Sequence, residues 1–338
     1  MKVPRRVQVP PLCRLLRHTW SLPLLIVVCL SLSAQTKSSR AADPADKAQF
    51  NRAERLAVQH RLPEARRILE SLIVAHPSAE TYLLLADVAR EQGDLEIAMK
   101  SLQSAAKLDR QLEAAYLEFS EISGDHGNAQ LALDSAEIGL ENIPTSYRLK
   151  IQKGIALDSL GRFAESTQIL KEAAAQQAEN SLALLSLAVV LTHENQLDEA
   201  NRILTNAIQR SPQDASLHYF HGKVLLQKSG TSTDGEALRS AAKQEFSESL
   251  RLDSSRSDAW YQLSTLYSPE QQSLAEQALR HCLTLDPQHA PAQYALARLY
   301  VRTGRKVQGE AMLARYKAQQ RANELRQNKQ LRIDVAQR

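Results

Sequence analysis

The residues best suited to chemistry in this sequence are two histidines and one cysteine. His218 and His221 lie three residues apart in the segment HYFH, so one helix face could present both rings to a metal ion. The sequence fixes no third His, Cys or carboxylate beside them, and two buried core histidines are the favoured interpretation. Cys282 falls at a small-residue packing position, where an inert buried thiol is expected.

Motifs that would support catalysis are missing from the chain. It contains no G-x-x-x-x-G-K-[ST] phosphate loop, no G-x-S-x-G nucleophile turn and no H-E-x-x-H zinc motif. We therefore predict a protein that is not an enzyme, with no catalytic residues, no metal and no cofactor.

The composition indicates which elements must position any functional residue. Hydrophobic residues make up 43% of the chain, but aromatic residues only 5%, and there are 11 glycines. Sheets are rich in β-branched and aromatic residues, and their turns use glycine. Here Ala, Leu, Gln, Glu, Lys and Arg, the strong helix formers, dominate instead. The sequence predicts an all-α protein.

A repeat organises the chain after residue 45. Each unit has a small residue, an apolar residue four positions later, a small or apolar residue three positions after that, and often a proline next. The anchors are Ala65, Ala98, Ala132, Ser166, Ala200, Ala242, Ala275 and Gly309, spaced by 33, 34, 34, 34, 42, 33 and 34 residues. Prolines such as Pro77 and Pro287 fall between units, where a helix would have to stop or start.

These units resemble the tetratricopeptide repeat, a helix pair with the pattern W-x2-L-G-x2-Y, A-x3-F and P that recurs about every 34 residues. The first part of the pattern is best matched in the last two units, by Trp260, Leu263, Ser264 and Tyr267 and by Leu296, Ala297, Tyr300 and Gly304. The resemblance covers roughly residues 46–320. It leaves no room for a catalytic domain.

The resemblance implies a right-handed superhelical solenoid of about eight helix pairs with a C-terminal capping helix. We expect the solenoid over residues 46–316, with units near 46–78, 79–112, 113–146, 147–180, 181–214, 215–256, 257–289 and 290–316. A basic helix or tail would follow over residues 317–338. The sixth unit carries about eight extra residues within Lys228–Ala237, which we expect to lengthen a surface loop.

In this family the first helices line a concave groove, and the resemblance transfers that role to particular positions. The fifth and nearby positions predict a partner-binding surface made of Leu83, Asp87, Leu117, Glu121, Ile151, Leu185, Tyr219, Lys223, Tyr261, Tyr294, Arg298 and Arg302. The surface would be acidic in its N-terminal half and basic with tyrosines in its C-terminal half. The same fifth positions could instead be apolar for packing alone.

These features favour a scaffold that holds an extended or helical peptide of another protein, with an acidic segment over the tyrosines. Lys and Asn at the fifth and ninth positions, which some relatives use to clamp a C-terminal carboxylate, are not found here. Two alternatives remain open: a structural protein that self-associates through its end units, and a solenoid that binds a small molecule or glycan.

The N-terminal segment indicates where the protein works. Residues 1–34 hold five basic and no acidic side chains, and the short apolar run Ser21–Leu32 is followed by small residues at Ser33 and Ala34. This is the layout of a secretory signal, and the run is shorter than the about 20 residues that span a bilayer. We predict export to a periplasm, with a bacterial origin assumed, or to the extracellular space. A retained N-terminal anchor, the only expected membrane contact, is the alternative.

The charge distribution and the positions of the cysteines also separate the leader, residues 1–34, from the rest of the chain. A polar linker, residues 35–45, precedes the repeats. Residues 35–338 carry 37 basic and 38 acidic side chains, so the high isoelectric point belongs mainly to the leader, and no nucleic-acid partner is expected. The basic C-terminal segment also lacks the aromatic residues on which bases stack. Cys13 and Cys29 lie in the leader, so Cys282 would remain alone and could form no internal disulfide.

Overall fold

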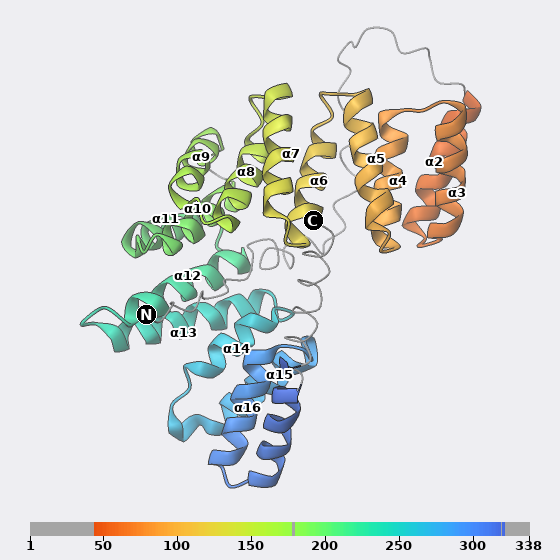
Figure 1. Ribbon diagram of the computed structural model, residues 1–338. Helices are drawn as coiled ribbons and strands as arrows, with labels where there is room; N and C mark the ends of the chain where they lie inside the picture. Colours follow the sequence, from red (N-terminus) through yellow and green to blue (C-terminus); the bar gives the residue numbers. More distant parts are fainter. Residues whose placement is uncertain (1–43, 178–179, 319, 322–338) are drawn as a thin grey trace, which may run out of the picture. The chain divides into compact units, whose positions relative to one another are not determined.

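Figure 1 shows a computed structural model of the protein, which describes residues 44–177, 180–318 and 320–321. The described residues contain helices and connections but no strand. The chain divides into two compact units at Gln196 and Leu197, and each is described by itself. The predicted leader lies outside the described residues.

The first unit is a run of helices in which each packs against the next, so that they form antiparallel pairs. Figure 1 shows these helices side by side from α2 to α10. Their bounds are α2 Pro44–Val58, α3 Leu62–Ala75, α4 Ala79–Glu91, α5 Leu95–Leu108, α6 Glu113–Asp125, α7 Ala129–Asn142, α8 Tyr147–Ser159, α9 Phe163–Gln176 and α10 Ser181–His193.

The second unit continues the alternation with one irregular pair. Its elements are α11 Leu197–Arg210, α12 Ala215–Ser229, α13 Gly235–Leu252, α14 Ser257–Thr265, the 3₁₀ helix η3 Pro269–Gln271, α15 Gln272–Leu285 and α16 Ala290–Arg302. Residues 306–318 are also helical and follow α16 as the second helix of the last pair. The expectation of an all-helical fold of stacked helix pairs is confirmed.

The core consists of the small and apolar positions that define the repeat. Ala65, Ala98, Ser166, Ala200 and Ala242 all have no exposed surface. Gly154 shows why small residues recur there, because a Cβ atom on it would lie 2.5 Å from Leu170 Cγ in the facing helix. Close approach of the two helices of a pair therefore depends on these positions.

In six of the eight described pairs, the turn between the two helices uses one residue with a positive φ angle. Glycine supplies it in four turns, for example Gly161 at +75°, because a residue without Cβ adopts this conformation at little cost. His60 at +55° and Asn195 at +59° occupy the same position in other pairs. Connections between pairs contain the prolines expected there, including Pro77 and Pro287.

The insertion in the sixth pair does not form the long surface loop predicted from the sequence. The helices that flank it are longer than their counterparts: α12 has 15 residues against 13 in α10, and α13 has 18 against 14 in α11. Only residues 230–234 remain as the turn. Lys228 and Ser229 belong to α12, and Gly235, Glu236 and Ala237 belong to α13, so half of the inserted segment is helical.

Candidate partner-binding pocket

A pocket in the second unit collects three of the predicted groove residues. It has a volume of about 440 Å³, within the usual range for ligand sites. Tyr294, Arg298 and Arg302 contribute one side from α16, and all three are exposed. The remaining lining residues come from the end of α14, the connection after it, α15 and the buried face of α16: Ser264, Thr265, Tyr267, Ser268, Ala275, Leu279, Ala295 and Leu299.

The pocket is located where the first helix of a pair is unusually short. α14 has 9 residues, whereas α16 has 13. After α14 the chain enters η3, in which Ser268 and Gln271 form a capping box and Pro269 occupies the first turn. The turn that α14 lacks would lie beside the C-terminal half of α16, so its absence uncovers Arg298 and Arg302.

The pocket is electropositive. Two arginines line it, and none of its lining residues is acidic. Arg298 lies with its guanidinium carbon 5.8 Å from the centre of the Tyr294 ring, and neither Arg298 nor Arg302 has an ion-pair partner among the described residues. Glu276 is nearby on α15, but it is bound by Arg305 at 2.5 and 3.0 Å and by Arg280 at 2.8 Å. The two pocket arginines therefore remain available to an anionic ligand.

Comparisons with known families and structures identify the fold. A family model described as "Psidin, N-terminal TPR repeats region" matches residues 122–227. Two models described as "Tetratricopeptide repeat" match residues 79–112 and 273–332. The chain is a tetratricopeptide-repeat protein. Repeats of this kind form scaffolds that generally mediate protein–protein interaction. No curated protein sequence matches the chain.

Solved structures with the same fold are distant in sequence. A tetratricopeptide repeat protein from Parabacteroides merdae is 14% identical, with a TM-score of 0.63, over 76% of this chain and 99% of that one. Yeast Tom70 is 14% identical, with a TM-score of 0.59, over 86% of this chain and 67% of that one. PilW, a type IV pilus biogenesis factor, is 17% identical, with a TM-score of 0.53, over 67% and 100%. At these identities the likeness concerns the fold alone.

Four residues predicted to present their side chains to the tetratricopeptide groove are buried instead. Leu117, Ile151, Leu185 and Tyr219 have exposures of 8%, 1%, 2% and 1%. For Leu117, Ile151 and Leu185 the reason is that the first helices of successive repeats contact one another directly, α6 with α8 and α8 with α10. The expectation that these side chains form a binding surface is therefore wrong, and packing explains their apolar character.

Tyr219 and Lys223 belong to a buried joint between α12 and α14. The guanidinium carbon of Arg256, itself 2% exposed, lies 5.0 Å from the Tyr219 ring centre and the guanidinium donates to Ser216 Oγ at 2.8 Å. Lys223 Nζ lies 5.8 Å from the same ring centre, and burial lowers the pKa of this lysine. Burial also raises the pKa of Tyr219. Tyr219 and Arg256 pack inside the stack and are poorly placed to meet a partner, whereas Lys223 is half-buried beside them.

Tyr261 and Leu83 have an intermediate position. Tyr261 is half-buried, with its ring centre 5.0 Å from that of His289, and burial raises the pKa of its hydroxyl. Leu83 is half-buried against the core of the second and third repeats. Of the predicted set, only the α16 residues are both exposed and gathered around a cavity.

The acidic half of the predicted groove is less charged than the sequence indicates. Asp87 and Glu121 are half-buried, and Arg90 contacts the Asp87 carboxylate at 3.3 Å. Burial and the charge of Asp87 raise the pKa of Glu118, on the neighbouring helix, to about 8. Burial also raises the pKa of Asp87. Glu118 is therefore mainly protonated at neutral pH, a property that the sequence analysis missed.

The two histidines have a structural role, and a carboxylate does lie beside them, contrary to the sequence analysis. Glu245 on α13 contacts both Nδ1 atoms, at 2.7 Å for His218 and 3.1 Å for His221. The Nε2 atoms face the Pro212 carbonyl at 3.0 Å and the Asn201 side-chain oxygen at 3.1 Å. Both rings are buried and link α11, α12 and α13. Among the described residues, no group of three such side chains is arranged to hold a metal ion.

The pocket residues that the sequence analysis missed are the hydroxyl groups of Ser264, Thr265, Tyr267 and Ser268. The sequence identifies Tyr267 only as part of the repeat pattern. Pro269 was the available signal, because a proline this close to the expected end of a first helix implies that the helix stops early. Within the described ranges, no helix is long and apolar enough to cross a membrane.

Proposed function

We propose that this tetratricopeptide scaffold binds an acidic peptide segment of another protein in the pocket on α14 and α16. The observation that carries the proposal is the convergence of Arg298, Arg302 and Tyr294 on one cavity with no acidic lining residue. Exposed arginines without an ion-pair partner bind carboxylates in bidentate geometry.

The rest of the lining suits a peptide better than a free anion. Tyr294 is 41% exposed and is held against Tyr316 with ring centres 5.5 Å apart, so it offers a rigid aromatic surface. Ala275, Leu279 and Leu299 supply apolar floor, and the hydroxyls at the end of α14 can bond a peptide backbone. An acidic residue next to an apolar one is the sequence feature that this combination selects.

The test uses fluorescence anisotropy with three labelled synthetic peptides that share apolar positions and differ only in charge: Asp/Glu, Asn/Gln or Lys. Wild type should bind the acidic peptide best, and the Arg298→Glu/Arg302→Glu double variant should lose at least about tenfold in affinity because two ion pairs become repulsive. Arg239→Glu is the matched control, since Arg239 is an exposed arginine of the same unit outside the pocket.

Tyr294→Ala should weaken binding of the acidic and the neutral peptide alike. Tyr219→Ala is unsuitable as a test, because removing a buried aromatic ring would destabilise the fold by about 3–5 kcal/mol. Equal affinity of wild type and the double arginine variant for the acidic peptide would refute the proposed site. Light scattering on the same samples separates binding from self-association.

We also propose that residues 1–34 direct export of the protein to a periplasm or the extracellular space. The support is the basic flank, the short apolar run and the small residues that follow it. N-terminal sequencing of the protein from a producing cell tests this, with a mature chain starting near Gln35 as the expected result. A chain that keeps Met1 and fractionates with membranes would identify the segment as an anchor instead.

A further inference from the structure

A second cavity lies in the first unit, on the side formed by second helices of the repeats. It has a volume of about 500 Å³, and its walls are α5 and α7 with α6 as the floor. Figure 1 shows α5 and α7 on either side of α6. Both walls are second helices of their pairs, so they run in the same direction and form a trough along their length.

The floor of this trough is apolar, and Leu131 and Ile138 add apolar surface on the α7 wall. Tyr116 and Phe119 on α6 form the floor, each 6% exposed. On α7, Leu131, Ser135, Ile138 and Asn142 follow one another at helical spacing and face the trough. Ile138 is 50% exposed, so a partner that covers it would remove apolar surface from water.

One end of the trough is closed by hydrogen bonds that fix its shape. The Tyr116 hydroxyl donates to the Arg110 carbonyl and accepts from Asn142 Nδ2, each at 3.3 Å. Gln111 Nε2 donates to the Asn142 carbonyl at 2.9 Å. The walls are therefore held apart before any ligand arrives, which lowers the entropic cost of binding.

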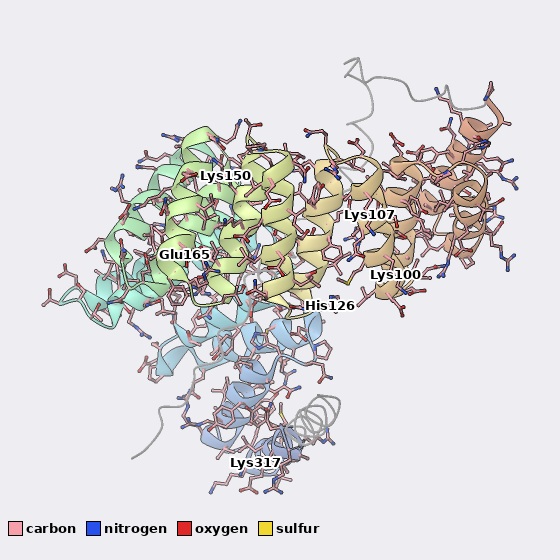
Figure 2. The ribbon with its side chains drawn as sticks, turned by 45° about the horizontal axis from the view of Figure 1, so that its top comes forward. Lys100, Lys107, His126, Lys150, Glu165 and Lys317 are labelled. Atoms are coloured by element: carbon pink, nitrogen blue, oxygen red, sulfur yellow. The ribbon has the colours of Figure 1, made fainter. Side chains whose placement is uncertain are left out.

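The two walls carry opposite charges. Lys107 and Arg110 lie along the α5 side, and Figure 2 labels Lys107 on that helix. Asp134 and Glu141 lie along the α7 side. Lys107, Arg110 and Glu141 form no ion pair with any residue in the part of the chain that the structure describes. The trough thus has a basic rim, an apolar floor and an acidic rim.

We propose that this trough binds one amphipathic helix of a partner protein. Its apolar stripe would cover Ile138, Phe119 and Tyr116, acidic residues on one flank would face Lys107 and Arg110, and basic residues on the other flank would face Asp134 and Glu141. The parallel walls fit a rod, and the opposite rims fit a helix with differently charged flanks. This site is separate from the acidic-peptide pocket of the second unit and does not depend on it.

The test uses labelled helical peptides of 14 residues, the length of α7. All share a leucine stripe, and their flanks are Glu and Lys, Glu on both sides, or Lys on both sides. Exchanging the two flanks would be uninformative, because a helix can enter the trough in either direction. The Glu/Lys peptide should bind about threefold to tenfold more tightly than either uniform peptide, since each uniform peptide loses one set of ion pairs.

Variants make the assignment specific. Lys107→Glu/Arg110→Glu renders both rims acidic and should transfer the preference to the peptide with Lys on both flanks. Ile138→Glu should reduce binding of every peptide by more than about tenfold, because it places a charge against the apolar stripe. Val74→Glu is its control, an 87% exposed apolar position on α3 outside the trough. Circular dichroism must show that each variant keeps its helices.

Three results would overturn the proposal. The first is equal binding of the three peptides to wild type. The second is an unchanged preference in the Lys107→Glu/Arg110→Glu variant. The third is equal binding of a Glu/Lys peptide with a central proline, which should instead lose on the order of a hundredfold in affinity if the occupant is a helix. Arg298→Glu/Arg302→Glu should leave all these affinities unchanged.

Discussion

We expect Glu118 to make the stability of the first unit depend on pH. Its carboxyl lies on α6 close to Asp87 on α4, and its Oε2 atom is buried with no hydrogen-bond partner among the described residues. Burial first, and the charge of Asp87 second, raise its pKa from an ordinary 4.5 to about 8. The folded protein therefore binds a proton at neutral pH that the unfolded chain releases.

The sign and size follow from proton linkage. A raised folded-state pKa contributes stability that is fully present below the unfolded value and is lost as the pH rises through about 8. One proton corresponds to at most about 1.4 kcal/mol per pH unit, so we expect the free energy of unfolding of this region to fall by roughly 2 kcal/mol between pH 6 and pH 8. Glu118→Gln stays neutral and should remove most of that slope.

The assay is hydrogen exchange of the α4 and α6 amides across this pH range, corrected for the intrinsic exchange rate. A local readout is needed because repeat stacks can open in parts rather than as one cooperative unit. Glu141→Gln, at an exposed glutamate of α7, is the control and should keep the wild-type slope. A wild-type slope that is flat, or that Glu118→Gln leaves unchanged, would refute the reasoning.

Three further predictions concern packing and turns. Gly154→Ala should lower the free energy of unfolding by about 1–3 kcal/mol in urea titrations, because the new Cβ would lie 2.5 Å from buried Leu170 Cγ. When Gly154→Ala is introduced into a Leu170→Ala variant, most of this loss should disappear, because the side chain that it would contact is gone. Cys282 should react with a disulfide reagent only after unfolding, since burial raises the pKa of its thiol to about 12; fast labelling of the native protein would contradict this. His60→Gly should raise the melting temperature, because it removes a left-handed strain of about 1 kcal/mol; an unchanged or lower melting temperature would count against it.

The helix pairs and their buried positions were predictable because the repeat encodes them locally. A small residue, an apolar residue four positions later and a second small or apolar residue place one helical face against its neighbour, and Ala65, Leu69 and Leu72 are buried as the pattern requires. The same spacing recurs in every unit. The pairing of the helices and their stacking were implied by the resemblance to the tetratricopeptide repeat.

Exposure at the fifth positions was not predictable in the same way. Whether Ile151 or Tyr294 meets solvent depends on how closely the next first helix packs, and this distance is set by residues of two repeats together. Ile151 is 1% exposed between complete helices, whereas Tyr294 is 41% exposed beside the shortened α14. The protonation of Glu118 could not be predicted from the sequence for the same reason, because it depends on burial and on Asp87 in the preceding repeat.

The pocket on α16 shows how a departure from the repeat can create a site without adding residues. In a complete pair, the last turn of the first helix lies beside the next first helix, and side chains there are partly covered, as Asp87 and Glu121 are. α14 ends after 9 residues, and Arg298 and Arg302 are exposed beside it, whereas Asp87 and Glu121, at the positions that correspond to Arg298, are half-buried beside complete helices. Restoring the missing turn by replacing Pro269 with Ala should therefore reduce acidic-peptide binding while leaving both arginines in place. If affinity stays the same in a variant shown to extend α14, the short helix is not what exposes the site.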